Sequence, residues 1–176
     1  VKNRIKLNEE INQKLEETAQ ALYKHWFVDF EFPNTEGKPY KSFGGKLIYN
    51  EELDREIPEG WIASSIDEIC DIQDGDRGKN YPKKEEFSDD GYCLFLNAGN
   101  VTKSGFDFSN NSFVNKEKYE LLRKGKLKRK DVVMTTRGTV VNIGYYNDKL
   151  DFENVRINSG MVILRNPKIS FFLYTK

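Results

Sequence analysis

The sequence is poor in the residues from which most catalytic and metal sites are built. Its 176 residues include one histidine, His25, and two cysteines, Cys70 and Cys93, which stand far apart with no CxxC spacing. A structural zinc site needs four clustered ligands, and a nucleophilic triad needs a histidine beside a serine or cysteine, so the sequence supports neither. We expect no bound metal, and we expect both cysteines to be buried thiols.

Long apolar runs are also absent. No stretch approaches the ~20 residues that cross a bilayer, and no succession of basic, apolar and small residues marks a signal peptide. Charged residues make up 32% of the chain and hydrophobic ones 38%, which is typical of a soluble globular protein. We therefore expect a cytoplasmic protein with no membrane partner, long enough for one domain and an appended element.

The formal net charge is zero, but the charges are unevenly placed. Eight acidic residues and a single basic one lie between Glu51 and Asp71, whereas nine basic residues and three acidic ones lie between Lys116 and Arg137. One face is therefore expected to be positive and suited to a phosphate backbone. In a neutral protein such runs are more often solvated loops, and the composition alone does not establish a binding surface.

Residues 11–30 predict a helix with a narrow apolar seam, because apolar residues recur there at steps of three and four. The seam consists of Ile11, Leu15, Thr18, Leu22 and Trp26, and an aromatic patch of Phe27, Phe30 and Phe32 follows it. A seam this narrow is typical of a coiled coil, so we expect a partner helix; packing on the core of its own domain is the alternative. The helix has no capping box at its start, and we expect it to continue from a longer chain.

The remainder predicts an α+β domain. Residues 33–56 are rich in proline and glycine and predict an ordered loop or meander, after which Ile57 to Trp61 (IPEGW) opens a new domain. Asn115 is a good N-cap for one short helix. Short β-prone runs predict a mixed or antiparallel sheet with strands at 69–73, 92–97, 131–136, 140–146 and 155–165. An apolar cluster at Ile169 and 171–174 suggests that a covering element is missing.

Two polar stretches could carry chemistry. The segment 74–82 (DGDRGKNYP) presents Arg77, Lys79, Asn80 and Tyr81, the side-chain types that contact bases and phosphates, and a surface turn with Arg77 paired to Asp74 or Asp76 is the alternative. The segment 135–139 (TTRGT) offers Thr136 and Arg137, with Asn142 close behind, and a solvated turn is the alternative. Residues 97–100 and 158–160 are polar and are expected on the same rim.

Enzymatic motifs are not supported. Asp29, Glu36 and Lys38 spell a nuclease-like triple, but they lie in and beside the linker and not on adjacent strands. The sequence 166–169 (NPKI) lacks the second proline and the aromatic residue of an adenine methyltransferase motif. We therefore expect the chain to catalyse nothing.

Several motifs in order resemble a known family. They are AQALYKHWFVDFEFP, GKPYKSFGGKL, IPEGW, DGDRGKNYP, DVVMTTRGTV and INSGMVILR. Together they resemble the DNA-specificity subunit of type I restriction-modification systems, from about residue 11 to the last residue. Such subunits contain two target-recognition domains, each followed by a conserved helix, and the two helices pair as a spacer and dock methyltransferase subunits.

By this resemblance, residues 1–32 would be the distal part of the first spacer helix and 33–56 a linker. Residues 57–176 would be most of the second target-recognition domain, truncated at its C-terminus. The chain would read one half of a bipartite site in double-stranded DNA and bind methyltransferase subunits, and through them restriction subunits. It would hold no cofactor, because S-adenosylmethionine, ATP and Mg belong to those partners.

The expected contacts follow from these roles. Arg77, Asn80 and Arg137 would contact base edges, with Lys79, Tyr81, Thr136 and Asn142 beside them, and Lys126, Lys128, Arg129 and Lys130 would contact phosphates. Ile11, Leu15, Thr18, Leu22, Trp26, Phe27 and Phe30 would face the partner helix. The alternatives are an assembly module that reads no DNA and a half-size subunit that dimerises through its helix.

Overall fold

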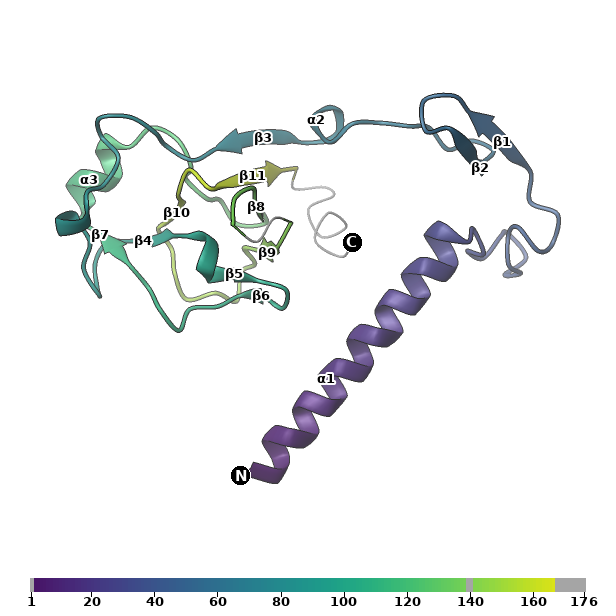
Figure 1. The fold of residues 1–176 in the computed structure, drawn as a ribbon, viewed down its shortest axis with the longest axis horizontal. Helices are drawn as coiled ribbons and strands as arrows, with labels where there is room; N and C mark the ends of the chain where they lie inside the picture. The colour runs from purple at the N-terminus through teal and green to yellow at the C-terminus, as the bar shows by residue number, and fades with distance from the viewer. Residues whose placement is uncertain (1, 139–140, 167–176) are drawn as a thin grey trace. The chain divides into compact units, whose positions relative to one another are not determined.

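The computed structural model describes residues 2–138 and 141–166. The chain forms two compact units, Val1–Ser64 and Ser65–Lys176, and each is described by itself (Figure 1). The predicted apolar cluster at 169–174, and residues 139 and 140, lie outside the described residues. The predicted divisions at residues 32 and 56 stay predictions.

The first unit begins with the predicted long helix, α1 (Lys2–Tyr23), which continues as a π-helical turn, η1 (Lys24–Val28). Every side chain from residue 3 to residue 25 is exposed, so no other described element of the first unit covers this helix. Side-chain pairs at i,i+4 run along its surface, and each such pair supports an isolated helix by only a few tenths of a kcal/mol. These pairs are Lys6–Glu10, Gln13–Glu17 and Gln20–Glu16.

Aromatic residues close the end of the helix. Phe30 has a left-handed backbone conformation (φ 60°) and is buried edge-on against Trp61, with ring centroids 5.5 Å apart. Phe32 stacks on both Trp61 and Tyr40. The unit is completed by an antiparallel hairpin of β1 (Leu47–Asn50) and β2 (Arg55–Pro58), and the proposed domain start at residue 57 falls within β2.

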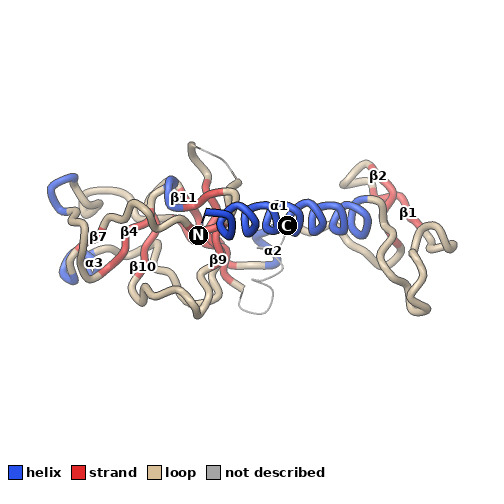
Figure 2. Tube along the Cα trace, turned by 90° about the horizontal axis from the view of Figure 1, so that it is seen from below, coloured by secondary structure: helices blue, strands red, loops and turns tan. Residues whose placement is uncertain are grey.

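The second unit is built from small sheets joined by long loops (Figure 2). The largest sheet is antiparallel, in the order β3-β11-β8-β9, with β3 (Asp71–Asp74), β11 (Met161–Arg165), β8 (Val132–Thr135) and β9 (Ile143–Tyr145). A second sheet has the order β10-β4-β7, with β10 (Val155–Ile157), β4 (Cys93–Leu96) and β7 (Phe113–Val114), and β10 runs parallel to β4. The last is a hairpin of β5 (Val101–Thr102) and β6 (Gly105–Phe106).

Short helices fill the connections of this unit. They are α2 (Ile66–Ile69), the 3-10 turns η2 (Lys84–Glu86) and η3 (Ala98–Asn100), and α3 (Lys116–Leu121). Asn115 caps α3 as predicted, since its side chain accepts the backbone N–H of Lys118 at 2.8 Å. The predicted fold class, an α+β chain with a long N-terminal helix, mixed or antiparallel sheets and short helices, is confirmed.

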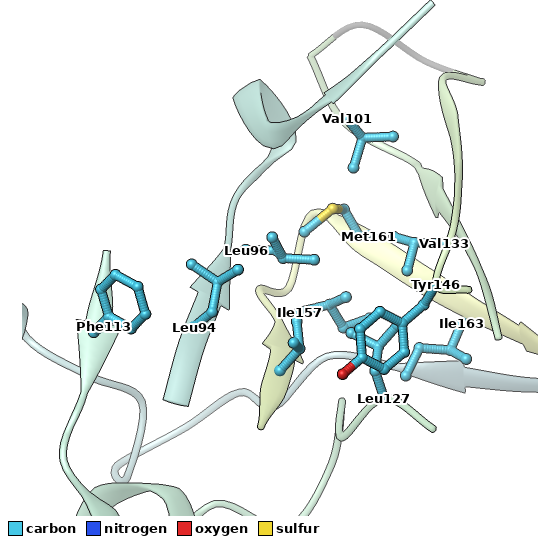
Figure 3. Packing of buried hydrophobic residues seen from close by; sticks show 11 residues of the cluster. Leu94, Leu96, Val101, Phe113, Leu127, Val133, Tyr146, Ile157, Met161 and Ile163 are labelled. Atoms are coloured by element: carbon cyan, nitrogen blue, oxygen red, sulfur yellow. The ribbon is translucent and has the colours of Figure 1, made fainter. Parts of the chain in front are cut away.

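The hydrophobic core lies between the two larger sheets. Leu94, Leu96 and Ile157 meet Val133 and Met161 there (Figure 3). The cluster is completed by Val101, Phe113, Leu127, Tyr146, Val155 and Ile163.

The other face of β4 is buried as well. Cys93 and Phe95 pack against Tyr119 and Leu122, and Cys70 lies in a third cluster, so both cysteines are the buried thiols that the sequence predicted. Desolvation raises the pKa of Cys93 to about 12. A strand buried on both faces reads as a continuous apolar run, which CLFL is.

The predicted single strand at 155–165 is wrong. The chain turns at Asn158–Gly160, where the Asn158 side chain accepts the backbone N–H of Gly160 at 2.9 Å, and β10 and β11 enter different sheets. An Asx turn of this kind is a local alternative to ladder hydrogen bonds. The predicted strand start at Ile69 is also wrong, because Ser65 and Glu68 form a capping box that makes 66–69 helical.

Gly75 passes very close to this turn. A Cβ on Gly75 would lie 2.1 Å from the backbone oxygen of Asn158, whereas a Cβ on Gly160 would lie 3.2 Å from the movable side-chain oxygen of the same residue. Only a residue without a side chain fits at position 75 unless the backbone shifts.

We expect Gly75→Ala to destabilise the second unit by about 1–3 kcal/mol or more, the usual cost of forcing extra atoms into a packed site. Gly160→Ala is the matched control and should cost clearly less. Urea unfolding of the two variants tests this, and equal midpoints would show that the approach of Gly75 to the turn is not a tight constraint.

Candidate nucleic-acid interface

The polar stretches named from the sequence meet at one edge of the second unit. β3 and β8 both run antiparallel to β11, with Asp74 opposite Val162 and Thr135 opposite Met161, so both strands end where β11 begins. β10 ends beside β4, and the N–H of Asn158 donates to the carbonyl of Leu96 at 2.9 Å. We call this edge, formed by residues 74–82, 97–100, 136–138 and 158–160, the rim.

The turn at 158–160 is the centre of the rim. Its Gly160 carbonyl accepts the N–H groups of Thr136 at 2.9 Å and Arg137 at 3.2 Å, and its Ser159 carbonyl accepts Nη2 of Arg77 at 3.3 Å. The structure therefore brings the two predicted loops, around Arg77 and around Arg137, to the same short turn.

Within the first loop, the side chains differ in how far they are free to bind. Arg77 forms the pair that the sequence left open, with its Nη2 2.8 Å from Oδ2 of Asp74. Lys79 is exposed, and the Asn80 carbonyl accepts Nζ of Lys118 at 3.4 Å. Tyr81 packs edge-on against Phe95 in the second core cluster, and burial raises its pKa.

Asp76 fixes this loop to the next element. Its carboxylate is buried and accepts the backbone N–H groups of Arg77 at 2.8 Å, Arg123 at 2.5 Å and Lys124 at 3.2 Å. Burial alone would raise the pKa of Asp76, but the three donors outweigh it and the pKa is lowered. The carboxylate thereby links the rim to the basic stretch that begins at Arg123.

That stretch, residues 123–130, is called the basic segment. Leu122, Gly125 and Leu127 are buried, while Arg123, Lys124, Lys126, Lys128 and Lys130 are exposed. The segment lies along β10, because Ile157 N–H donates to Gly125 O at 2.9 Å and Leu127 N–H donates to Val155 O at 3.0 Å. The cations project to solvent because this extended pairing turns every second side chain outward.

Two arginines, Arg156 buried and Arg165 partly buried, hold the backbone of the basic segment. Arg156 donates to the carbonyls of Lys124 at 2.6 Å, Tyr119 at 2.7 Å and Leu122 at 2.6 Å, and burial lowers its pKa. Its guanidinium lies over the Tyr119 ring, 4.6 Å from the centroid. Among the described residues, no carboxylate forms an ion pair with Arg156.

The other arginine, Arg165, forms a bidentate pair with Asp131 at 2.8 and 2.7 Å and also donates to the Lys126 carbonyl at 2.9 Å. The hydrogen bonds that Arg165 donates to Asp131 raise the pKa of Arg165. Asp131 accepts the Lys128 N–H at 2.7 Å as well. The segment is thus fixed at positions 124, 126 and 128 without use of the lysine side chains.

A groove of about 390 Å³ runs between β3 and the basic segment. It is lined by Ile72, Gln73, Asp74, Arg123, Lys124, Gly125, Lys126, Lys128 and Arg165. Within the described part of the chain, no ion pair uses Lys124, Lys126 or Lys128, although Lys126 lies 4.7 Å from the centre of the Tyr119 ring. Since Asp74 is the one carboxylate among its lining residues, the groove attracts anions.

Two predicted contact residues are engaged inside the unit. Arg129 donates to the carbonyls of Asn147 at 2.7 Å and Phe152 at 3.2 Å and lies over the Tyr146 ring. Asn142 donates to the carbonyl of Val101 at 2.8 Å. The sequence interpretation also missed three groove residues, Gln73, Arg123 and Lys124. The signal that points to Arg123 and Lys124 is the interspersion of basic residues with the buried residues 122, 125 and 127.

The predicted helix seam is exposed along most of its length. The exposed fractions are 44% for Ile11, 62% for Leu15 and 46% for Leu22. Phe27 is exposed and Trp26 half-buried, whereas Phe30 is buried against Trp61. Thr18 donates its hydroxyl to the Lys14 carbonyl within the helix.

No helix in the described ranges is long and apolar enough to cross a membrane. In the same ranges, no three histidine, cysteine, aspartate or glutamate side chains come together as metal ligands would.

Comparison with known proteins identifies relatives of part of the chain. No protein-family model matches the sequence. The type I restriction enzyme MjaIX specificity subunit of Methanocaldococcus jannaschii is 32% identical over 104 residues, which cover 59% of this chain and 21% of that protein. This chain is a partial homologue of type I restriction enzyme specificity subunits. The resemblance predicted from the motifs is confirmed.

One further sequence relative and two solved structures are also similar to this chain. The HindI specificity subunit of Haemophilus influenzae is 62% identical over 29 residues, which cover 16% of this chain and 6% of that protein. The HsdS subunit of Thermoanaerobacter tengcongensis shares the fold over 98% of this chain and 36% of its own, with a TM-score of 0.54 and 15% identity. A second solved structure, from work on the structural basis of complex assembly and conformational transition of the type I R-M system, gives the same coverage, TM-score and identity. The chain spans about a fifth of the length of the first relative.

The buried Asp76 carboxylate yields a prediction. Asp76→Ala leaves the N–H groups of Arg123 and Lys124 without their acceptor, and we expect a loss of about 1–3 kcal/mol in the free energy of unfolding. Asp74→Ala removes a partly exposed pair and should cost only about 0–1 kcal/mol.

The same prediction has a pH dependence. Because the pKa of Asp76 is lowered on folding, its contribution is fully present above its unfolded value of about 3.9 and is lost as the pH falls through the folded pKa. The difference between wild type and Asp76→Ala in urea unfolding should therefore shrink between pH 7 and pH 3. A difference that stays constant would rule out this role.

Proposed function

We propose that the chain is a cytoplasmic DNA-recognition piece of a type I restriction-modification complex. In this proposal it reads one half of a bipartite site in double-stranded DNA and docks methyltransferase subunits, which in turn bind restriction subunits. It performs no catalysis itself, and S-adenosylmethionine, ATP and Mg are bound by those partners. Residues 1–32 serve as the spacer helix, 33–56 as a linker and 57–176 as the target-recognition domain.

The observation that carries the DNA-binding part is the continuity of the basic groove with the polar rim. Asp74 lines the groove and pairs with Arg77 on the rim, and Asp76 binds the first backbone amides of the basic segment. Phosphate contacts position a protein on DNA, whereas side chains that reach base edges specify the sequence. A fixed row of cations beside a fixed polar edge supplies both kinds of contact, to phosphates and to base edges.

Within this division, the groove cations Lys124, Lys126 and Lys128, with Lys130 beyond them, bind phosphates. Arg77, Lys79, Asn80, Thr136 and Arg137 face the bases from the rim. Arg129, Tyr81 and Asn142 support these contacts from inside the unit, because their polar atoms or rings are already engaged there.

The helix part of the proposal rests on the exposed seam of α1. A line of leucine and isoleucine side chains on a helix that no described element covers fits a helix-to-helix contact. The same exposure also favours a second candidate, in which two copies of the chain associate through their helices as a half-size specificity subunit.

The groove assignment predicts a specific loss of DNA affinity. Lys124→Ala, Lys126→Ala and Lys128→Ala together should weaken binding to all duplex sequences alike. Each removed phosphate contact should lower the slope of log K against log salt by about 1. Fluorescence titration of labelled duplexes at several salt concentrations measures both quantities.

Lys103→Ala with Lys149→Ala is the control, since both lysines are exposed and neither lines the groove. If the triple variant keeps the salt slope of the wild type, the groove is not the phosphate-binding surface and the proposed function loses its main support.

The helix assignment predicts a loss of assembly. Leu15→Ser with Leu22→Ser should weaken association with methyltransferase subunits by tenfold or more, since burying one leucine contributes about 1.5–3 kcal/mol. Glu16→Ser with Glu17→Ser, off the seam, should have little effect. Co-purification and solution mass report the result. A wild-type dimer that the leucine variant converts to monomer would select self-association instead.

A further inference from the structure

We propose that Asp74 and Arg77 act as one unit that reads a single G·C base pair in the major groove of the bound DNA. This inference rests on the proposed function and adds to it the residue Asp74 and the chemistry of one base pair. The juxtaposition of a carboxylate and a guanidinium, at the point where the basic groove meets the rim, carries it.

Both side chains are held in place and remain accessible. Nη2 of Arg77 lies 2.8 and 3.1 Å from the two oxygens of Asp74, and the side chains are 54% and 39% exposed. Nη2 also donates to the Ser159 carbonyl at 3.3 Å. Within the described ranges, the hydrogen bonds of this guanidinium use Nη2 alone, so the donors on Nε and Nη1 are left for a ligand.

The backbone between the two residues is fixed as well. Gly75 is buried against the carbonyl of Asn158, and Asp76 is bound to three backbone N–H groups. Asp74 is paired in the sheet opposite Val162. A pair held this firmly loses little conformational freedom on binding, so its geometry can discriminate between base pairs.

The order of donors and acceptors matches one type of base pair. In the major groove a G·C pair presents the acceptors N7 and O6 of guanine and then the N4 amino donor of cytosine. A free guanidinium nitrogen beside a carboxylate offers a donor followed by an acceptor, which complements the edge of the pair from the guanine acceptors N7 and O6 to the cytosine amino group. An A·T pair presents acceptor, donor and acceptor, so the carboxylate would face O4 of thymine and be repelled.

The position of Asp74 in a cationic groove supports the same conclusion. The phosphates that the neighbouring lysines attract would be repelled by this carboxylate, so it weakens binding to the DNA backbone. A carboxylate that faces an amino donor on a base instead offsets that cost and adds sequence discrimination. The N4 amino group of cytosine is the donor that acidic side chains accept from in the major groove.

Selection of duplexes from a randomised double-stranded library tests the proposal, with the full chain as wild type, Arg77→Ala and Asp74→Asn. The wild-type motif should contain a G·C pair. Arg77→Ala should lose the preference for a G·C pair at that position, and Asp74→Asn should tolerate an A·T pair there better than the wild type does. Arg4→Ala and Asp71→Asn, both at exposed positions outside the groove, serve as matched controls.

A base analogue gives a second readout that a merely structural role would not change. Replacing that guanine by 7-deazaguanine removes the N7 acceptor and should weaken wild-type binding by about tenfold, while Arg77→Ala should be insensitive to the replacement. Thermal unfolding followed by circular dichroism establishes that both variants are folded.

The outcomes separate the two proposals. If the wild type selects a motif that both variants retain, the Asp74–Arg77 inference is overturned and the proposed function stands. If the wild type selects no motif at all, the sequence-selective function is overturned, and the inference that rests on it falls as well.

Discussion

The candidate interface depends on the buried groups that hold the backbone of the basic segment. Cations at alternate positions repel one another, so they cannot keep an extended segment in place by their own contacts. Arg156 binds the Lys124 carbonyl, Arg165 binds the Lys126 carbonyl, and Asp131 binds the Lys128 N–H. The side chains of these lysines, which stand at alternate positions, are therefore left for a ligand because the backbone is already bound.

The buried charge of Arg156 contributes in a second way. Its partners are backbone carbonyls and the face of the Tyr119 ring, none of which neutralises its charge, and its Nε has no hydrogen-bond partner among the described residues. A positive charge therefore remains beneath the basic segment, where the surrounding protein screens it less than water would.

The sequence predicts those features that depend on local patterning. The apolar repeat of α1, the capping residue Asn115 and the continuous apolar run of β4 each have a period or a signature that neighbours in the chain determine. The division of 155–165 into two strands does not, because it depends on β10 finding β4 some sixty residues away. The prediction is right for the residues of β10 and β11 but misses the turn between them and the change of sheet.

The same limit applies to the candidate site. Composition identifies the basic run, but only the pairing with β10 determines which of its side chains face solvent, so Arg129 was grouped with Lys128 although it is bound to carbonyls of 147 and 152. From the sequence, the Arg77 guanidinium could pair with Asp74, with Asp76 or with neither. The fold assigns Asp74 to the guanidinium and Asp76 to the backbone.

The strand order of the largest sheet has a consequence for the order in which the chain folds. β11 lies between β3 and β8, and its partner β3 is about ninety residues earlier in the chain. Contacts between residues so far apart form slowly, because a long loop must close first. During synthesis the largest sheet cannot close until β11 has left the ribosome, so the groove beside β3 and the rim, which depend on this sheet, form late.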